Sequence, residues 1–175
     1  MGLRIRGGAL ALLATWTLTT APAHAQNVVP DACYGDGAAA VICIVNEGRQ
    51  SLGLRKLRTH PVLTEAAERY ARQMVREDFF SHVDPEGNGP TDRLVEAGYG
   101  ERRQGDSWRA GEVLGSGTQV LSTPQAMAFM WLASPSHRRI VLGRRYRHVG
   151  AGIATVLSPD GGFPEQRYVL YAGRR

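Results

Sequence analysis

The chain has 175 residues, of which 43% are hydrophobic and 21% are charged, and its formal net charge at pH 7 is +5. This length suits one ordinary domain with a single sizeable core, so we expect no second domain. The charge is too small to indicate a nucleic acid or another polyanion as the partner, and no repeat or low-complexity segment is present.

Residues 1–25 are predicted to be a secretory signal peptide. Arg4 and Arg6 precede the apolar run ALALLATWTL, and the small residues of Ala-His-Ala stand before Gln26 as a cleavage site. A membrane anchor is the alternative, but this run is shorter than the roughly 20 residues of a membrane-spanning helix. No later segment is apolar enough to cross a bilayer. We therefore expect a secreted protein, extracellular or periplasmic, with a net charge of +3 after cleavage.

An irregular N-terminal arm is expected at residues 26–37, where Pro, Asp, Gly and small residues predominate. Cys33 and Cys43 are the only cysteines of the chain. Export exposes them to an oxidising compartment, which favours a disulfide over the alternative of two reduced, buried thiols. Closing a loop of about ten residues stabilises a fold by about 2 to 3 kcal/mol in the chain-entropy model.

Helices are expected to dominate the first part of the domain, which we place at residues 38–175. One helix covers AAAVICIVNEGRQSLG and ends near Gly53, and the next covers LTEAAERYARQMVRED, where apolar residues recur at helical spacing. PTDRLVEAGYG predicts a short helix that ends at Gly98. The core residues expected on the two long helices are Ala38, Val41, Ile42, Val45, Leu63, Ala67, Tyr70 and Met74.

Strands follow, with one more helix between them. AGEVLGSG is compatible with a strand, and STPQAMAFMWLAS predicts a helix capped by Thr123, begun by Pro124 and ended by Pro135, with Met127, Met130 and Trp131 buried. HVGAGIATVL and QRYVLYAG are predicted strands joined through the turn residues of SPDGGFPE. Helices first and antiparallel strands last indicate an α+β layered domain, because parallel strands need crossover helices between them.

Two histidines and a glutamate are the candidate site residues. His82 in FFSHVDPEG and His137 in WLASPSHRRIVL each lie just past an expected element boundary, and Glu112 is a lone carboxylate in a small, apolar segment. Such a set can hold zinc with an open coordination position, or transfer protons without a metal. The alternative is two separate capping histidines and a surface glutamate, because the spacing of H-E-x-x-H is absent.

The chain resembles a bacterial member of the CAP superfamily, the SCP-like extracellular domains related to cysteine-rich secretory and plant pathogenesis-related proteins. The resemblance runs through VNEGRQSLGL, LTEAAERYARQM, FFSH, TDRLVEAGY, AGEVL, SPSHRRIVL, HVGAGIA and YVLYAG in this order. It implies a three-layer α/β/α sandwich with a central, mainly antiparallel sheet. It also implies a shared cleft lined by His82, Glu112 and His137, with Phe79 and Phe80 anchoring the helix end before His82.

Two positions depart from the family pattern. Val113 follows the glutamate where the family has an asparagine, and Ser134 occupies the second acidic position, as in many bacterial relatives. One carboxylate fewer makes a metal site weaker. No cofactor is required by this interpretation, and zinc is expected to bind weakly, through His82 and His137 with Glu112 as a third ligand.

The resemblance implies the cleft but not its ligand. We expect a secreted, non-enzymatic binding module whose cleft holds a small lipid or glycan, or a weakly bound divalent metal. A metal-assisted hydrolase with His82, Glu112 and His137 as its catalytic residues is the alternative, and a module that docks on the cell envelope is another. Envelope docking would use Arg138, Arg139, Arg144, Arg145 and Arg147, which otherwise form a solvated face. We expect a monomer, and structural roles for Asn46, Arg49, Arg93, Tyr168 and Tyr171.

Overall fold

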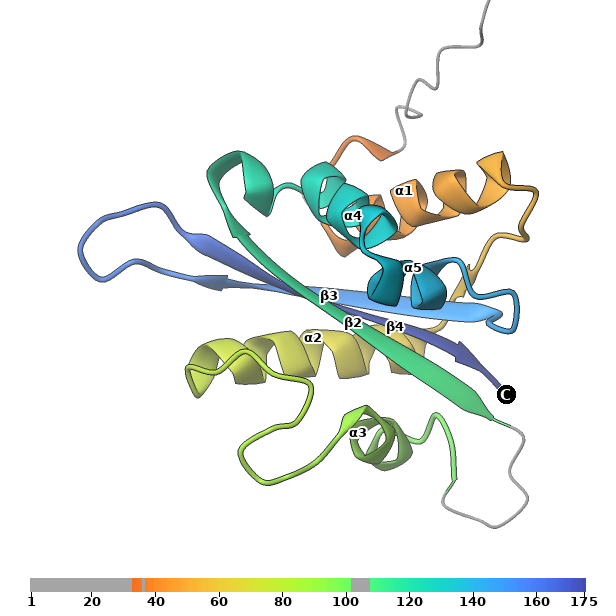
Figure 1. Cartoon of the computed structure of the whole chain (residues 1–175). Helices are drawn as coiled ribbons and strands as arrows, with labels where there is room; N and C mark the ends of the chain where they lie inside the picture. Colours follow the sequence, from red (N-terminus) through yellow and green to blue (C-terminus); the bar gives the residue numbers. More distant parts are fainter. Residues whose placement is uncertain (1–32, 36, 102–107) are drawn as a thin grey trace, which may run out of the picture.

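A computed structural model describes residues 33–35, 37–101 and 108–175. The expected signal peptide and most of the expected N-terminal arm therefore lie outside the described residues. Figure 1 shows three layers, with a central sheet between helices α1, α4 and α5 on one face and helices α2 and α3 on the other. The predicted α/β/α sandwich is confirmed. Within the described residues, no helix is long and apolar enough to span a membrane.

The sheet has four strands in the order β1-β3-β4-β2. The antiparallel hairpin of β3 (His148–Val156) and β4 (Glu165–Arg174) is as predicted, and β2 (Arg109–Thr118) pairs antiparallel with β4. The two-residue strand β1 (Arg58–Thr59) pairs parallel with β3 and was not expected, because two residues are too few to show an alternating pattern. Strand β2 thus forms one edge of the sheet.

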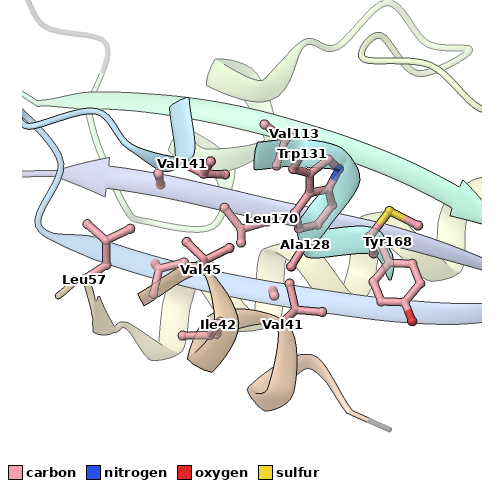
Figure 2. Packing of buried hydrophobic residues seen from close by; sticks show 14 of the residues in the cluster. Val41, Ile42, Val45, Leu57, Val113, Ala128, Trp131, Val141, Tyr168 and Leu170 are labelled. Carbon is pink, nitrogen blue, oxygen red and sulfur yellow. The ribbon is translucent and has the colours of Figure 1, made fainter. Parts of the chain in front are cut away.

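Helices α1 (Ala38–Ser51), α4 (Pro124–Ala133) and α5 (Pro135–Val141) cover one face of the sheet. Figure 2 shows Trp131 among the aliphatic side chains of this core, and its indole Nε1 donates to Leu114 O at 2.8 Å. Thr123 caps α4 as predicted, since its hydroxyl accepts from Ala126 N. Met130 is only partly buried, so its prediction as a core residue was too strong.

Helices α2 (Pro61–Arg76) and α3 (Pro90–Glu96) cover the opposite face. Helix α2 begins two residues before the expected start, and its apolar face is buried as predicted. The backbone of α2 lies directly on β3, because a Cβ atom on Gly150 would come within 2.2 Å of Leu63 C, and one on Gly152 within 2.3 Å of Glu68 N. Larger residues at these two positions would push the helix away from the sheet.

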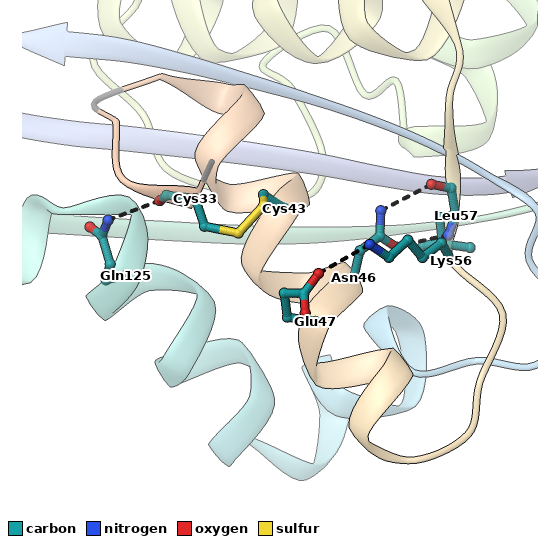
Figure 3. The surroundings of a disulfide bond; sticks show 7 residues. All are labelled: Cys33, Cys43, Asn46, Glu47, Lys56, Leu57 and Gln125. Carbon is teal, nitrogen blue, oxygen red and sulfur yellow. Dashed lines mark hydrogen bonds and ion pairs between the residues drawn. A yellow bond between two sulfur atoms is a disulfide. The ribbon is translucent and has the colours of Figure 1, made fainter. Parts of the chain in front are cut away.

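A disulfide joins Cys33, which lies before α1, to Cys43 within α1, as predicted (Figure 3). Gln125 of α4 donates to Cys33 O at 3.2 Å. Further along α1, the Asn46 amide bonds to both Leu57 N and Leu57 O. Arg49 is buried beneath α5 and donates to three backbone carbonyls, Arg55 O, Val141 O and Gly143 O. The structural roles expected for Asn46 and Arg49 are thus confirmed.

Candidate functional site

The segment between α2 and α3 carries His82. Phe79 packs against the core under α2, with its ring centroid 6.0 Å from that of Tyr70. The Tyr70 hydroxyl donates to Ser81 O at 2.6 Å, which holds the backbone just before His82. Phe80 is 47% exposed, so the prediction that it anchors the helix end is wrong. Phe79 and the Tyr70 hydroxyl position the segment.

A turn closes this segment before α3 begins. The buried Asp84 carboxylate accepts from Asn88 N at 2.7 Å and from the Asn88 side chain at 3.1 Å. The Asp92 carboxylate accepts from Gly89 N at 2.8 Å and so caps α3. Local side-chain bonds to the backbone therefore define the path of the loop on both sides of Asn88.

Glu112 lies in the middle of this arrangement on edge strand β2. Its side chain is 1% exposed, and both carboxylate oxygens are engaged. Oε1 accepts from His82 Nδ1 at 2.6 Å, and Oε2 accepts from Arg93 Nη2 at 2.7 Å. A buried carboxylate needs such compensation, because burial of an unpaired charge is costly. The structure therefore brings His82 and Glu112 into direct contact, with Glu112 behind His82.

Arg93 of α3 is the residue that joins the parts of the site. Besides Glu112, its guanidinium donates to Tyr171 Oη at 3.1 Å, to Asn88 O at 2.7 Å and to His82 O at 3.0 Å. Its Cζ atom also lies 3.4 Å from the centroid of the Tyr70 ring. Sequence reasoning gave Arg93 a structural role but did not include it in the site. No local sequence pattern predicts this role, because the partners of Arg93 lie on two strands and a loop.

The protonation of His82 follows from this geometry. The hydrogen bond to Glu112 raises the pKa of His82, because a carboxylate stabilises the imidazolium ion. Nδ1 must be the donor to a carboxylate, so Nε2 is the second nitrogen, and it has no partner among the described residues. The His82 side chain is 53% exposed. The site therefore presents Nε2 to solvent.

His137 is the second imidazole that the sequence offers as a candidate for the site. It lies in the first turn of α5, just past the boundary at which α4 ends and Pro135 begins α5, as expected. Burial lowers the pKa of His137, and the nearby positive charge of His82 lowers it further. The two imidazoles are therefore close enough to interact electrostatically. Ser134 precedes α5, and its hydroxyl lies 3.1 Å from that of Ser136.

A metal has few donors in this arrangement. Within the described parts of the chain, no group of three or more His, Cys, Asp or Glu side chains is placed to hold a metal ion. To serve as a third ligand, Glu112 would have to weaken its bonds to His82 or Arg93. Two imidazoles, His82 Nε2 and His137, are the donors that remain for zinc.

A second pair of histidines also comes together, at the other end of α2. The His60 and His148 rings lie with centroids 4.9 Å apart, and the Tyr99 hydroxyl is 2.9 Å from His148 Nδ1. Arg175 donates to His60 Nε2 at 3.1 Å. Burial lowers the pKa of both imidazoles. Sequence reasoning treated these two residues separately, because their proximity depends on the parallel pairing of β1 with β3.

The family model of the cysteine-rich secretory proteins, CAP, matches residues 44–170 of the chain. The chain belongs to the CAP family. This match covers the described helices and strands except residues 38–43 of α1 and residues 171–174 of β4. The resemblance seen in the sequence is thereby confirmed.

Several bacterial proteins are similar to this CAP domain. It is 24% identical over 140 residues to the uncharacterized protein YkwD of Bacillus subtilis, covering 78% of this chain and 51% of that protein. The chain thus spans about half the length of that relative.

Among solved structures, an outer surface protein of Borrelia burgdorferi has a TM-score of 0.60 at 21% identity, over 77% of this chain and 90% of that chain. An extracellular protein of Bacillus anthracis containing an SCP domain has a TM-score of 0.57 at 23% identity, over 74% of this chain and 38% of that chain. These structures establish the shared CAP fold.

Proposed function

We propose that this CAP domain is a secreted, non-enzymatic binding module whose cleft at His82 and His137 holds the polar group of a small lipid or glycan. The observation that carries the proposal is the double engagement of Glu112 by His82 and Arg93. A carboxylate that already accepts from two donors orients an imidazole and does not readily take a proton from a substrate. His82 Nε2 is then the group that meets a ligand.

The opposite pKa shifts of the two histidines support recognition of an oxygen-rich group. The raised pKa of His82 shifts its imidazole toward the imidazolium ion, and the lowered pKa of His137 shifts its ring toward the neutral form. An imidazolium donates from both nitrogens, whereas a neutral ring donates from one and accepts at the other. A hydroxyl, carboxylate or phosphate oxygen can bond to such a pair.

The hydrolase alternative has less support from the same residues. Glu112 would act as its general base, yet Glu112 is buried and engaged. Ser134 and Ser136 are the nearby hydroxyls, and they face each other instead of an activating base. A hydrolytic metal centre would also need a third protein ligand, and the described residues do not offer one.

Native mass spectrometry tests the binding proposal on the processed, disulfide-bonded protein recovered after export. We expect a bound lipid or glycan on the wild type and its loss from the His82→Ala/His137→Ala double variant. His148→Gln is the matched control, because it changes a histidine outside the cleft. The proposal fails if the wild type carries no adduct, or if the double variant carries the same adduct as the wild type.

Zinc binding is proposed as a weak, secondary property of the same two imidazoles. We expect calorimetry to give a dissociation constant no tighter than micromolar, because two imidazoles are the donors that remain for zinc among the described residues. Binding should weaken as pH falls through the histidine range near 6.5, since protons compete for the same nitrogens. His82→Ala and His137→Ala should each abolish it. Equal zinc binding by the wild type and both variants would mean that the histidines form no joint metal site.

A further inference from the structure

A pocket of about 290 Å³ lies beside the first residues of β2. Its lining residues come from α3, from the start of β2 and from the connection between α5 and β3: Thr91, Trp108, Arg109, Ala110, Arg145 and Tyr146. None of these six side chains is acidic. Ala110, which also lines the pocket, lies two residues before Glu112 on the same face of β2, about 7 Å away at roughly 3.3 Å per residue. The pocket therefore lies close to the carboxylate that orients His82.

Two arginines from separate elements meet in this pocket. Arg109 opens β2, and Arg145 lies in the connection between α5 and β3. Both are exposed, and neither forms an ion pair with a described residue. Two like charges facing one small volume repel each other unless an anion lies between them. This arrangement favours a negatively charged group in the pocket.

Aromatic residues make the other walls, and glycines hold them in place. A Cβ atom on Gly100 would lie 2.2 Å from the Trp108 ring, so the indole packs flat against the backbone there. The Trp108 Nε1 atom donates to Glu101 O at 2.8 Å, which orients the ring. Tyr146 is 6% exposed, and a Cβ atom on Gly111 would lie 2.7 Å from its hydroxyl. The pocket therefore has a packed aromatic wall beside its two exposed cationic side chains.

From this geometry we propose that the pocket binds the anionic group, a phosphate or a carboxylate, of the ligand whose polar group reaches His82 and His137. Arginine suits this task because its planar guanidinium bonds to two oxygens of either group at once. The proposal deepens the proposed function, on which it rests, by naming the ligand class: a small acidic lipid or glycan. The proposed site is this pocket and not the basic surface as a whole, because a bidentate bond needs a guanidinium group next to the bound anion.

Inorganic phosphate and acetate are the probes that test the pocket by itself. Each is titrated into the mature protein at fixed ionic strength, and binding is followed by NMR of the arginine Nε–H groups and the Trp108 indole. We expect at least one anion to shift the signals of Trp108, Arg109 and Arg145. Binding should weaken at least tenfold in Arg109→Gln and in Arg145→Gln. The stronger of the two anions identifies the ligand as a phosphate or a carboxylate.

Arg138→Gln is the matched control, because Arg138 is an exposed arginine of α5 that does not line the pocket. We expect it to change anion affinity less than twofold. An equal loss in Arg138→Gln would mean diffuse attraction to a basic surface and would overturn the proposal, as would the failure of both anions to shift these signals. The anion titration tests the pocket, and native mass spectrometry tests the ligand in the cleft. Failure of the pocket proposal can therefore be distinguished from failure of the proposed function.

Discussion

The buried ion pair of Arg93 and Glu112 holds the candidate site together, so its removal should unfold the region around it. Replacing Arg93 by Met leaves Glu112 without its cation, at a position where the glutamate side chain is 1% exposed. It also removes the donors to Tyr171 Oη, Asn88 O and His82 O. Removing one partner of a buried pair costs about 3 to 5 kcal/mol. That is a large part of the roughly 5 to 15 kcal/mol that stabilises a domain.

Urea unfolding of the disulfide-bonded protein at pH 7, followed by circular dichroism, measures this loss. The double variant Arg93→Met/Glu112→Gln should be more stable than Arg93→Met alone, because it also removes the buried charge. Arg72→Met is the matched control, since its exposed pair with Glu68 should contribute about 0.5 kcal/mol or less. The reasoning is refuted if Arg93→Met loses less than about 1 kcal/mol, the size of an exposed pair, or if the double variant is the less stable of the two.

Three further predictions concern stability. Trp131→Ala should cost about 3 to 5 kcal/mol in the same urea assay, and far more than His82→Ala, because Trp131 is 1% exposed in the core; equal losses would make His82 a core residue. Reducing the disulfide of Figure 3 should cost about 2 to 3 kcal/mol, and the intact mass of the unreduced protein should show no free thiol. The pKa values of His60 and His148 are lowered in the fold, so their unfolded forms bind more protons and stability should fall as pH drops below about 6.5. His148→Gln should reduce the loss of stability between pH 7.5 and 5. His82→Ala should enlarge this loss, because the raised pKa of His82 stabilises the fold at low pH. The contribution of His82 fades as pH rises through its pKa in the fold.

The elements that the sequence predicted well are those whose signal is local. The apolar faces of α1 and α2 repeat at helical spacing over 14 and 16 residues, and Thr123 with Pro124 marks the start of α4. Turn residues between two β-branched runs likewise predicted the β3–β4 hairpin. Strand β1 and helix α5 are too short for a period, so they were found only in the structure.

The residues of the site could be named from the sequence, but their roles could not. Composition and the family resemblance brought His82, Glu112 and His137 together as candidates, whereas the contact of Glu112 with both His82 and Arg93 joins positions 30 and 19 residues apart. That contact decides that Glu112 orients an imidazole. Together with the burial of His137, it also decides that His82 gains a proton more easily than His137. Hydrophobic spacing and capping act over a few residues and can be read along the chain. Burial, partner choice and pKa depend on which distant segments pack against one another, so only the tertiary structure determines them.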